Sequence, residues 1–547
     1  MRLSLLVITL IILAGCANQV TPTGGEKDIV APTAIAYTPD SNAINFSATE
    51  IVIVFDEYVQ LNDVFNQIII SPPLDETPAF KLKGKTLTIK LNATLKPETT
   101  YTINFGQAIK DNTEGNILEN FTYVFSTGSF IDSMQVSGTV TEILTGAPSK
   151  KTYVVLYYEP TDTSFTKTKP YYFAKTDAAG NFNIKNIRSG KYKLYAIEDQ
   201  NFNYYYDLPN ERIAFQSDIL TIDSNVAKQK LQLFSEDKGL QNLLESKSSR
   251  YGQTKLVFSK NTKSTIIKYT GSDTSAEYFS RNITNDTILF WKTNFLLDTH
   301  QLSIQFDTTI LNRVVEIKEF SADSSFYKNV NTFTTNVTAV GKGSDANTRA
   351  DWDPAKPIIL NFSNPIKQIN YDGVKVYSDS VLLTSSSSID SLDARKVYIN
   401  YNWKPGVNYD IIIPAKSHSD IFNLYNTADT IKIATRKTDA YATLTTTIKN
   451  TSGSPLIFQL MRFDLSIVEE KYLTPTQFEN AALSFAVKQM YLLPGIYRIR
   501  VIIDSDGNGE WTTGDLQKNV QPETVIFFSV DQNLRANWEN EIDWEIK

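Results

Sequence analysis

Short runs of alternating apolar and polar residues recur from about residue 31 almost to the end of the chain. Examples are EIVIVF, TLTIKL, TYTINF, KYKLYAI, KVYINY and YRIRVII, all rich in β-branched and aromatic residues. A period of two places one face of a strand in a core and leaves the other face in solvent. Turn residues separate the runs at spacings typical of β-sandwiches. The pattern therefore predicts an all-β fold.

The size of the chain predicts several such sandwiches. Its 547 residues are too many for one hydrophobic core and predict about four or five domains of roughly 100 to 150 residues. The apolar share of 41% is typical of folded protein rather than disorder. The net charge is -7 and the Lys and Arg residues are scattered, so no nucleic-acid partner is predicted.

Helical periodicity is scarce in this sequence. The segment DKGLQNLLESK, residues 237–247, has apolar residues at helical spacing and predicts one short amphipathic helix. The segment TPTQFENAALSFAVK, residues 474–488, fits either a helix or a strand. All other periodic segments predict strands.

One internal repeat joins a strand ending in Phe to a later turn and strand. IVIVFDEYV recurs in outline as TKLVFSKNT and IILNFSNPI, and LKPETTYTINF recurs as WKPGVNYDIII. Lys96, Pro97 and Tyr101 are thereby matched by the Lys-Pro pair at 404 and 405 and by Tyr409. The Pro suits the turn and the Tyr enters the next strand. These segments resemble bacterial Ig-like domains of surface and S-layer-type proteins, at 31–128 and more weakly near 250–320 and 335–437.

A second repeat matches SGKYKLYAIEDQNFN with PGIYRIRVIIDSDGN near the C-terminus. The matched pairs are Gly190 with Gly495, Tyr192 with Tyr497, Asp199 with Asp504 and Asn203 with Asn508. The earlier copy resembles the carboxypeptidase-regulatory, transthyretin-like sandwich. The fold class is therefore expected to be a tandem array of Ig-like and transthyretin-like β-sandwich domains.

The expected division of the chain follows these two repeats. It comprises a signal peptide at 1–15, a flexible tether at 16–30, an Ig-like domain at 31–128, a transthyretin-like domain at 129–235, Ig-like sandwiches at 236–334 and 335–437, and a transthyretin-like domain at 438–547.

The N-terminal segment predicts lipid anchoring. After Arg2, an apolar run of about eleven residues ends just before Cys16, the only cysteine of the chain. This run is shorter than the roughly 20 residues that span a bilayer and predicts a signal peptide. The four residues LAGC resemble the bacterial lipobox, which implies lipidation, for instance by palmitate, of Cys16. Ala17 follows the cysteine, so the resemblance implies the outer membrane, with cell surface favoured over periplasmic face. The lipobox, the TPTGGEKD tether and this order of modules together resemble the Ig-like-domain outer-membrane lipoproteins of Bacteroidota.

The segment DSDGNGEWTTGD carries the spacing of a calcium-binding loop. Alternate residues of such a loop direct oxygen atoms to one centre, and a Gly at position 6 permits the sharp turn. The predicted calcium ligands are Asp504, Asp506, Asn508, Glu510, Thr512 and Asp515. The open alternative is a hairpin rich in Gly and Asp that needs no metal.

The matched loop DQNFNYYYDLPNE is a weaker metal candidate. It offers Asp199, Asn201, Asn203 and Asp207, but Tyr204 stands where the calcium loop has Gly. Its aromatic run also suits sugar stacking, although alternating tyrosines on a strand explain it equally well.

No catalytic residue is predicted. The two histidines, His300 and His418, lie in different regions and at no spacing known for a hydrolase metal site. We expect a non-catalytic, lipid-anchored outer-membrane protein that binds protein partners, or an accessory subunit of an outer-membrane machine for β-barrel assembly, secretion or gliding. The alternatives are a surface adhesin, a glycan-binding protein and, less favoured, a hydrolase. Lipidated Cys16 would tie the chain to the outer membrane.

Overall fold

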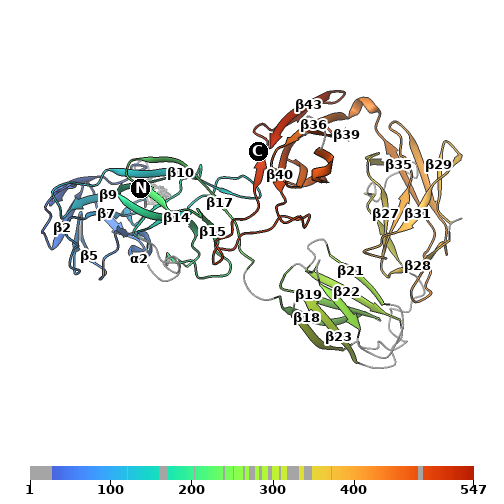
Figure 1. Ribbon diagram of the computed structural model, residues 1–547, viewed down its shortest axis with the longest axis horizontal. Helices are drawn as coiled ribbons and strands as arrows, with labels where there is room; N and C mark the ends of the chain where they lie inside the picture. The colour runs from blue at the N-terminus through green and yellow to red at the C-terminus, as the bar shows by residue number, and fades with distance from the viewer. Residues whose placement is uncertain are drawn as a thin grey trace, which may run out of the picture. The chain divides into compact units, whose positions relative to one another are not determined.

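The computed structural model describes residues 28–119, 121–158, 170–201, 204–237, 241–250, 252–260, 262, 265–269, 277–282, 286–293, 299–306, 309–316, 332–337, 348–370, 373–478 and 484–546. The chain divides into two compact units, one of Met1–Asp237 with Thr512–Glu523 and one of Lys238–Trp511 with Thr524–Lys547. Figure 1 shows strands throughout, and most sheets join strands of similar colour because they use neighbouring stretches of chain. The all-β fold and the tandem array of sandwiches predicted from sequence are confirmed.

The first sandwich contains one short helix, α2 (Val64–Gln67). Its larger sheets have the orders β1-β2-β6-β5 and β4-β7-β9, and a third sheet pairs β3 with β8. Alternate residues of β2 and β6 are fully buried, as the period-two pattern predicts. The strands are β1 (Ala34–Thr38), β2 (Glu50–Phe55), β3 (Val59–Leu61), β4 (Ile69–Ser71), β5 (Ala79–Lys83), β6 (Thr86–Lys90), β7 (Thr100–Asn104), β8 (Ile109–Asp111) and β9 (Thr122–Ser126).

The second sandwich packs a sheet of order β13-β10-β17 against a sheet of order β12-β11-β14-β15, in which β16 also pairs with β14. Strand β10 pairs antiparallel with β13 and parallel with β17. The strands are β10 (Met134–Glu142), β11 (Tyr153–Tyr158), β12 (Tyr172–Lys175), β13 (Asn181–Ile187), β14 (Gly190–Glu198), β15 (Arg212–Phe215), β16 (Leu220–Ile222) and β17 (Val226–Leu233).

The third sandwich has sheets of order β18-β19-β22-β21 and β20-β23-β24. Its described core includes Leu256, Phe290 and Ile304. The strands are β18 (Leu243–Arg250), β19 (Gln253–Phe258), β20 (Ile266–Tyr269), β21 (Glu277–Arg281), β22 (Thr287–Lys292), β23 (Thr299–Phe306) and β24 (Thr309–Glu316).

The fourth sandwich has sheets of order β25-β27-β32-β31 and β26-β35-β33-β29-β30, with β28 paired to β34. A 3-10 helix, η2 (Thr438–Ala440), follows its last strand. The strands are β25 (Phe333–Thr335), β26 (Ala350–Trp352), β27 (Ile358–Phe362), β28 (Ile366–Ile369), β29 (Lys375–Ser378), β30 (Val381–Leu383), β31 (Ser386–Ile389), β32 (Lys396–Asn400), β33 (Asn408–Ile413), β34 (His418–Asp420) and β35 (Asp429–Thr435).

The fifth sandwich repeats the strand arrangement of the second. Strand β36 pairs antiparallel with β39 and parallel with β43, as β10 does with β13 and β17. The other sheet has the order β38-β37-β40-β41, with β42 pairing β40. The elements are β36 (Ala442–Asn450), β37 (Leu456–Arg462), β38 (Ile467–Leu473), η3 (Pro475–Phe478), β39 (Ser484–Leu492), β40 (Gly495–Ile503), β41 (Val525–Phe527), β42 (Gln532–Leu534) and β43 (Glu539–Ile546).

The matched tyrosines of both repeats make matched contacts. The hydroxyl of Tyr101 accepts a 2.8 Å hydrogen bond from the Lys96 N–H, and Tyr409 accepts one of 2.8 Å from the N–H of residue 404. In the other repeat, the hydroxyls of Tyr192 and Tyr497 donate to backbone carbonyls four positions upstream, at 2.8 and 2.7 Å. These contacts confirm both alignments at the level of single residues.

The helix predicted at residues 237–247 is wrong where the structure describes the segment. Strand β18 begins at Leu243 and pairs antiparallel with β19, with Leu243 opposite Phe258. A helix of about eleven residues is marginal in water, and strand pairing supplies a hydrogen-bonding partner along β18. The ambiguous segment 474–488 divides between η3 and the start of β39.

Candidate functional site

Two loops at equivalent positions of the second and fifth sandwiches hold the predicted metal ligands. One joins β14 to β15 and the other joins β40 to β41. Each loop begins with a buried aspartate directly after the central strand, Asp199 in the first and Asp504 in the second. The preceding strand therefore fixes where each carboxylate enters its loop.

The Asp504 carboxylate organises the start of its loop. It accepts hydrogen bonds from the backbone N–H groups of Gly507 at 2.9 Å, Asn508 at 3.1 Å and Gly509 at 2.9 Å. Gly507 and Gly509 have φ of 73° and 77°, a left-handed backbone that a side chain disfavours. The glycines thus let the chain wind tightly around one carboxylate.

Three carboxylates converge at this point. Oxygen atoms of Asp504, Asp506 and Glu523 all lie within 4.8 Å of one another. Asp504 and Glu523 are buried, and Asp506 is exposed. Calcium prefers six to eight oxygen ligands, so a group of three carboxylates in a loop that also offers carbonyl and amide oxygens fits that ion.

The ionisation of Asp504 suits a cation. Burial by itself raises the pKa of Asp504, but hydrogen bonds, led by that from the Gly509 N–H, outweigh burial and lower the pKa below its ordinary value. The carboxylate is therefore charged at neutral pH.

The predicted ligands are only partly brought together. Asp504 and Asp506 lie in the group, and the Asn508 side chain contacts Asp506, with its amide nitrogen 3.0 Å from a carboxylate oxygen. The backbone N–H of Glu510 donates to Asn508 at 2.6 Å. Asp515 instead forms an ion pair of 2.8 Å with Lys518, which lowers its pKa.

Glu523 is the residue that sequence reasoning missed. Its carboxylate accepts a 2.9 Å hydrogen bond from the N–H of Thr512, one of the predicted ligands. Glu523 lies 19 positions after Asp504, outside the twelve-residue loop template. The internal repeat offered a signal for Glu523, because the matched loop also ends in a glutamate. That residue, Glu211, lies one position before β15.

In the loop between β14 and β15, the weaker metal candidate, backbone N–H groups of the loop itself bind the carboxylates. Asp199 accepts from the N–H groups of Asn201 at 3.1 Å and Tyr204 at 2.7 Å, and buried Glu211 accepts from the N–H of Asp207 at 2.9 Å. Asn201 and Asp207 also share a side-chain hydrogen bond of 3.2 Å. Among the described residues, the carboxylates of Asp199, Asp207 and Glu211 form no group of three close metal-binding oxygens. Asn203, like Cys16 and the tether up to residue 27, lies outside the described residues.

The two histidines lie on strands of different sandwiches. His300 lies on β23 and His418 on β34, in different sandwiches. His418 is fully buried, its ring lies 5.0 Å from that of Phe362, and its Nδ1 is 2.9 Å from the Ser417 hydroxyl. Burial lowers its pKa to about 4, so the ring is neutral at neutral pH.

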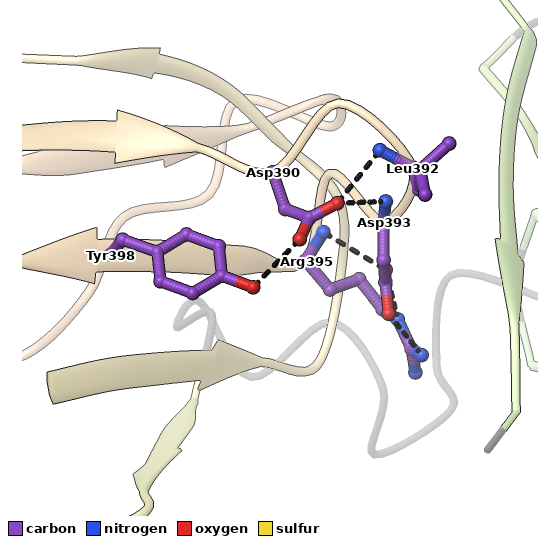
Figure 2. A network of polar contacts seen from close by, with 5 residues as sticks. All are labelled: Asp390, Leu392, Asp393, Arg395 and Tyr398. Carbon is purple, nitrogen blue, oxygen red and sulfur yellow. Dashed lines mark hydrogen bonds and ion pairs between the residues drawn. The ribbon is translucent and has the colours of Figure 1, made fainter. Parts of the chain in front are cut away.

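A dense charged network occupies the turn between β31 and β32 (Figure 2). Asp390 accepts hydrogen bonds from the N–H groups of Leu392 and Asp393, at 2.7 and 2.9 Å, and from the Tyr398 hydroxyl at 2.8 Å. Asp393 binds the Arg395 guanidinium through both oxygens, at 3.0 and 2.9 Å. Because these contacts join the turn to itself and to Tyr398 on β32, the network fixes the path of the chain between the two strands.

A shallow hollow of about 650 Å³ lies in the fourth sandwich. Its lining includes Tyr401, Trp403, Asn400 and Asn402, with serine, threonine and lysine side chains. None of its lining residues is Asp, Glu, His or Cys. The hollow therefore offers aromatic and amide contacts but no acid–base pair.

Two family models match parts of this chain. Residues 28–127 match the bacterial Ig-like domain, which covers the first sandwich. Residues 136–218 match the model of polysaccharide lyase family 4, domain II, which covers most of the second sandwich. A search of curated proteins finds no match.

Among solved structures, the chain is similar to the N-terminal part of the bacterial S-layer protein SbsC, at 13% identity and a TM-score of 0.14 over 53% of this chain and 45% of that one. It is also similar to BcpA, the major pilin subunit of Bacillus cereus, at 10% identity and a TM-score of 0.13 over 76% and 99%. Against a longer SbsC structure it spans 64% of that chain. Similarities this low carry no functional argument, so the fold rests on strand pairing and the family models.

Within the part of the chain that the structure describes, no helix is long and apolar enough to cross a membrane.

Proposed function

We propose that this protein is a non-catalytic, lipid-anchored outer-membrane protein that binds other proteins through its β-sandwiches. The observation that carries the proposal is the bacterial Ig-like match at 28–127 within a tandem sandwich array. Such sandwiches expose broad sheet faces and loops on rigid scaffolds, which suits protein binding. The lipobox-like LAGC sequence at 13–16 supports attachment through Cys16.

The finer version of the proposal is an accessory subunit of an outer-membrane machine in a Bacteroidota cell. The LAGC sequence, the tether and the order of modules, including transthyretin-like second and fifth sandwiches, support it by resemblance. The test is co-purification in mild detergent through a C-terminal tag, with Cys16→Ser as the matched control. We expect the native chain to recover an outer-membrane protein and the variant to leave the membrane fraction. If no outer-membrane protein is recovered with the native chain, the proposal of a machine subunit is contradicted.

We also propose that calcium stabilises the loop after β40. Three close carboxylates and a low pKa at Asp504 support this. The bound ion would supply positive charge that holds Asp504, Asp506 and Glu523 together. Its role is structural, because the same residues already shape the turn through backbone hydrogen bonds.

A glycan ligand is the second candidate function, favoured by the hollow in the fourth sandwich. An aromatic ring beside amide and hydroxyl groups suits a sugar, which has apolar faces and many hydroxyls. Binding to a glycan array that Tyr401→Ala abolishes supports this candidate, and an array without a single ligand excludes it.

A further inference from the structure

A hairpin near the C-terminus is closed by hydrogen bonds of its own. It covers Thr512–Glu523, which belongs to the same compact unit as the first two sandwiches. Its base is closed by two hydrogen bonds, from the Thr512 N–H to the Glu523 carboxylate at 2.9 Å and from the Glu523 N–H to the Thr512 carbonyl at 3.0 Å. Asp515 and Val520 pair across it, at 2.9 and 2.8 Å. The segment therefore holds its own shape.

Polar groups of this hairpin form hydrogen bonds with residues that follow β17. The Thr513 hydroxyl donates to the Ser235 carbonyl at 2.6 Å. The backbone N–H of Leu516 donates to the Glu236 carboxylate. These partners are 278 and 280 positions apart in the sequence. Ordering segments so distant costs loop-closure entropy, which the contact must offset.

A second side chain of the hairpin, that of Gln521, reaches β15. The Gln521 amide nitrogen donates to the Phe215 carbonyl at 2.9 Å and lies 3.1 Å from the Ser217 hydroxyl. The hairpin thus contacts the end of β15 and the residues that follow β17.

A glycine allows the hairpin to approach an aromatic ring closely. A Cβ atom at Gly514 would lie 2.8 Å from the Cζ atom of Phe234 and 2.8 Å from the Val520 carbonyl oxygen. Phe234 is only 2% exposed, and it contacts Phe215 with ring centroids 6.0 Å apart. Any side chain at position 514 must displace the hairpin, the ring or both.

We propose that Phe215, Ser217, Phe234, Ser235 and Glu236 form a docking surface whose ligand is the chain's own hairpin Thr512–Glu523. The occupant is specified by the polar contacts of three hairpin residues, Thr513, Leu516 and Gln521, and by the glycine that fits over Phe234. Without the hairpin, Phe234 loses the cover that Gly514 gives it, and the docking surface presents an aromatic ring and the acceptor groups that the hairpin donors bind. This inference does not depend on membrane anchoring or on calcium.

The test is hydrogen exchange, read by mass spectrometry, on the full chain and on Gly514→Val. We expect backbone amides of 212–217, 232–236 and 512–523 to exchange about tenfold faster or more in the variant, because exchange follows the local opening that docking suppresses. Gln521→Ala, which leaves the hairpin backbone intact, should speed the same peptides to a smaller extent. The matched control is Gln517→Val, since Gln517 is exposed at the hairpin tip.

Three outcomes would overturn the proposal. One is unchanged exchange in all three segments of Gly514→Val and of Gln521→Ala. The other is protection in the native chain that disappears on dilution, because the hairpin would then come from a second copy rather than from its own chain. Faster exchange throughout both variants would also contradict it, since docking predicts an effect confined to the three segments.

Discussion

Two tyrosine hydroxyls illustrate how much a single hydrogen bond contributes in these sandwiches. Tyr101 and Tyr409 each accept a backbone N–H across a turn while their rings stay buried. We expect Tyr101→Phe or Tyr409→Phe to lose about 1 kcal/mol of stability, since the ring remains and one N–H loses its partner. The measurement is the urea midpoint of the sandwich that carries the change.

Tyr37→Phe is the control for Tyr101→Phe. Tyr37 lies in the same sandwich, contacts the rings of Phe121 and Tyr123, and among the described residues its hydroxyl makes no hydrogen bond. Equal losses in Tyr37→Phe and Tyr101→Phe would show that the turn bond contributes nothing specific.

His418 makes the stability of the fourth sandwich depend on pH. An unfolded histidine titrates near pH 6.5, whereas burial holds the folded pKa of His418 at about 4. The folded state therefore binds fewer protons between these values. The contribution of neutral His418 to the free energy of unfolding is fully present above pH 6.5. It is lost as the pH drops toward 4, and the loss is about 3 kcal/mol in total.

Isotope labelling of histidine tests this directly, because the chain has only His300 and His418. One ring signal should titrate below pH 5, and it should persist in His300→Gln. Titration of both rings near pH 6.5 would contradict a buried neutral His418. The sequence could not predict this property, because burial of one ring depends on strands β28 and β34 meeting.

At the scale of elements, the parallel contact of β10 with β17 depends on Gly138. A Cβ atom there would lie 2.0 Å from the carbonyl oxygen of Gln229 on the neighbouring strand. We expect Gly138→Ala to push the two strands apart and cost about 1 to 3 kcal/mol. The urea midpoint of the second sandwich measures it. Thr139→Ala, one position along β10, should cost less, and an equal loss would refute the steric reason.

The loop after β40 allows the sequence template and the structure to be compared by experiment. If calcium binds through Asp504, Asp506 and Glu523, the ion at one hundred times its dissociation constant adds about 2.7 kcal/mol of stability. Glu523→Gln should abolish this gain, whereas Asp515→Asn should preserve it, because Asp515 pairs with Lys518. Calorimetry with calcium or chelator gives the readout. If Asp515→Asn alone removed the calcium-dependent gain in stability, Asp515 would be a ligand, as the twelve-residue calcium-loop template predicts.

The elements also show where sequence reasoning succeeds. Strands and repeats were predictable because alternation and turn residues are local, as at β2, β7 and β40. Strand β18 was not predictable from sequence, because its apolar residues also fit a helix. Only its pairing with β19 makes it a strand. Glu523 was not, because its distance from Asp504 along the chain is set by the length of an intervening hairpin.

At the scale of the whole molecule, each sandwich has a hydrophobic core of its own among the described residues. A destabilised core should therefore unfold in its own transition rather than lower one common transition. Ile53 belongs to the core of the first sandwich and Leu360 to that of the fourth, and both are fully buried.

We expect Ile53→Ala and Leu360→Ala each to cost about 2 to 5 kcal/mol, through lost burial and the cavity left behind. Hydrogen exchange in rising urea should show the loss in peptides of the substituted sandwich, while peptides of the other keep their midpoint. The double variant should show the two losses added, since the sites share no partners. A single transition that shifts as a whole in either variant would mean that the array folds as one cooperative body, and surface binding would then have to be treated as a property of the entire chain.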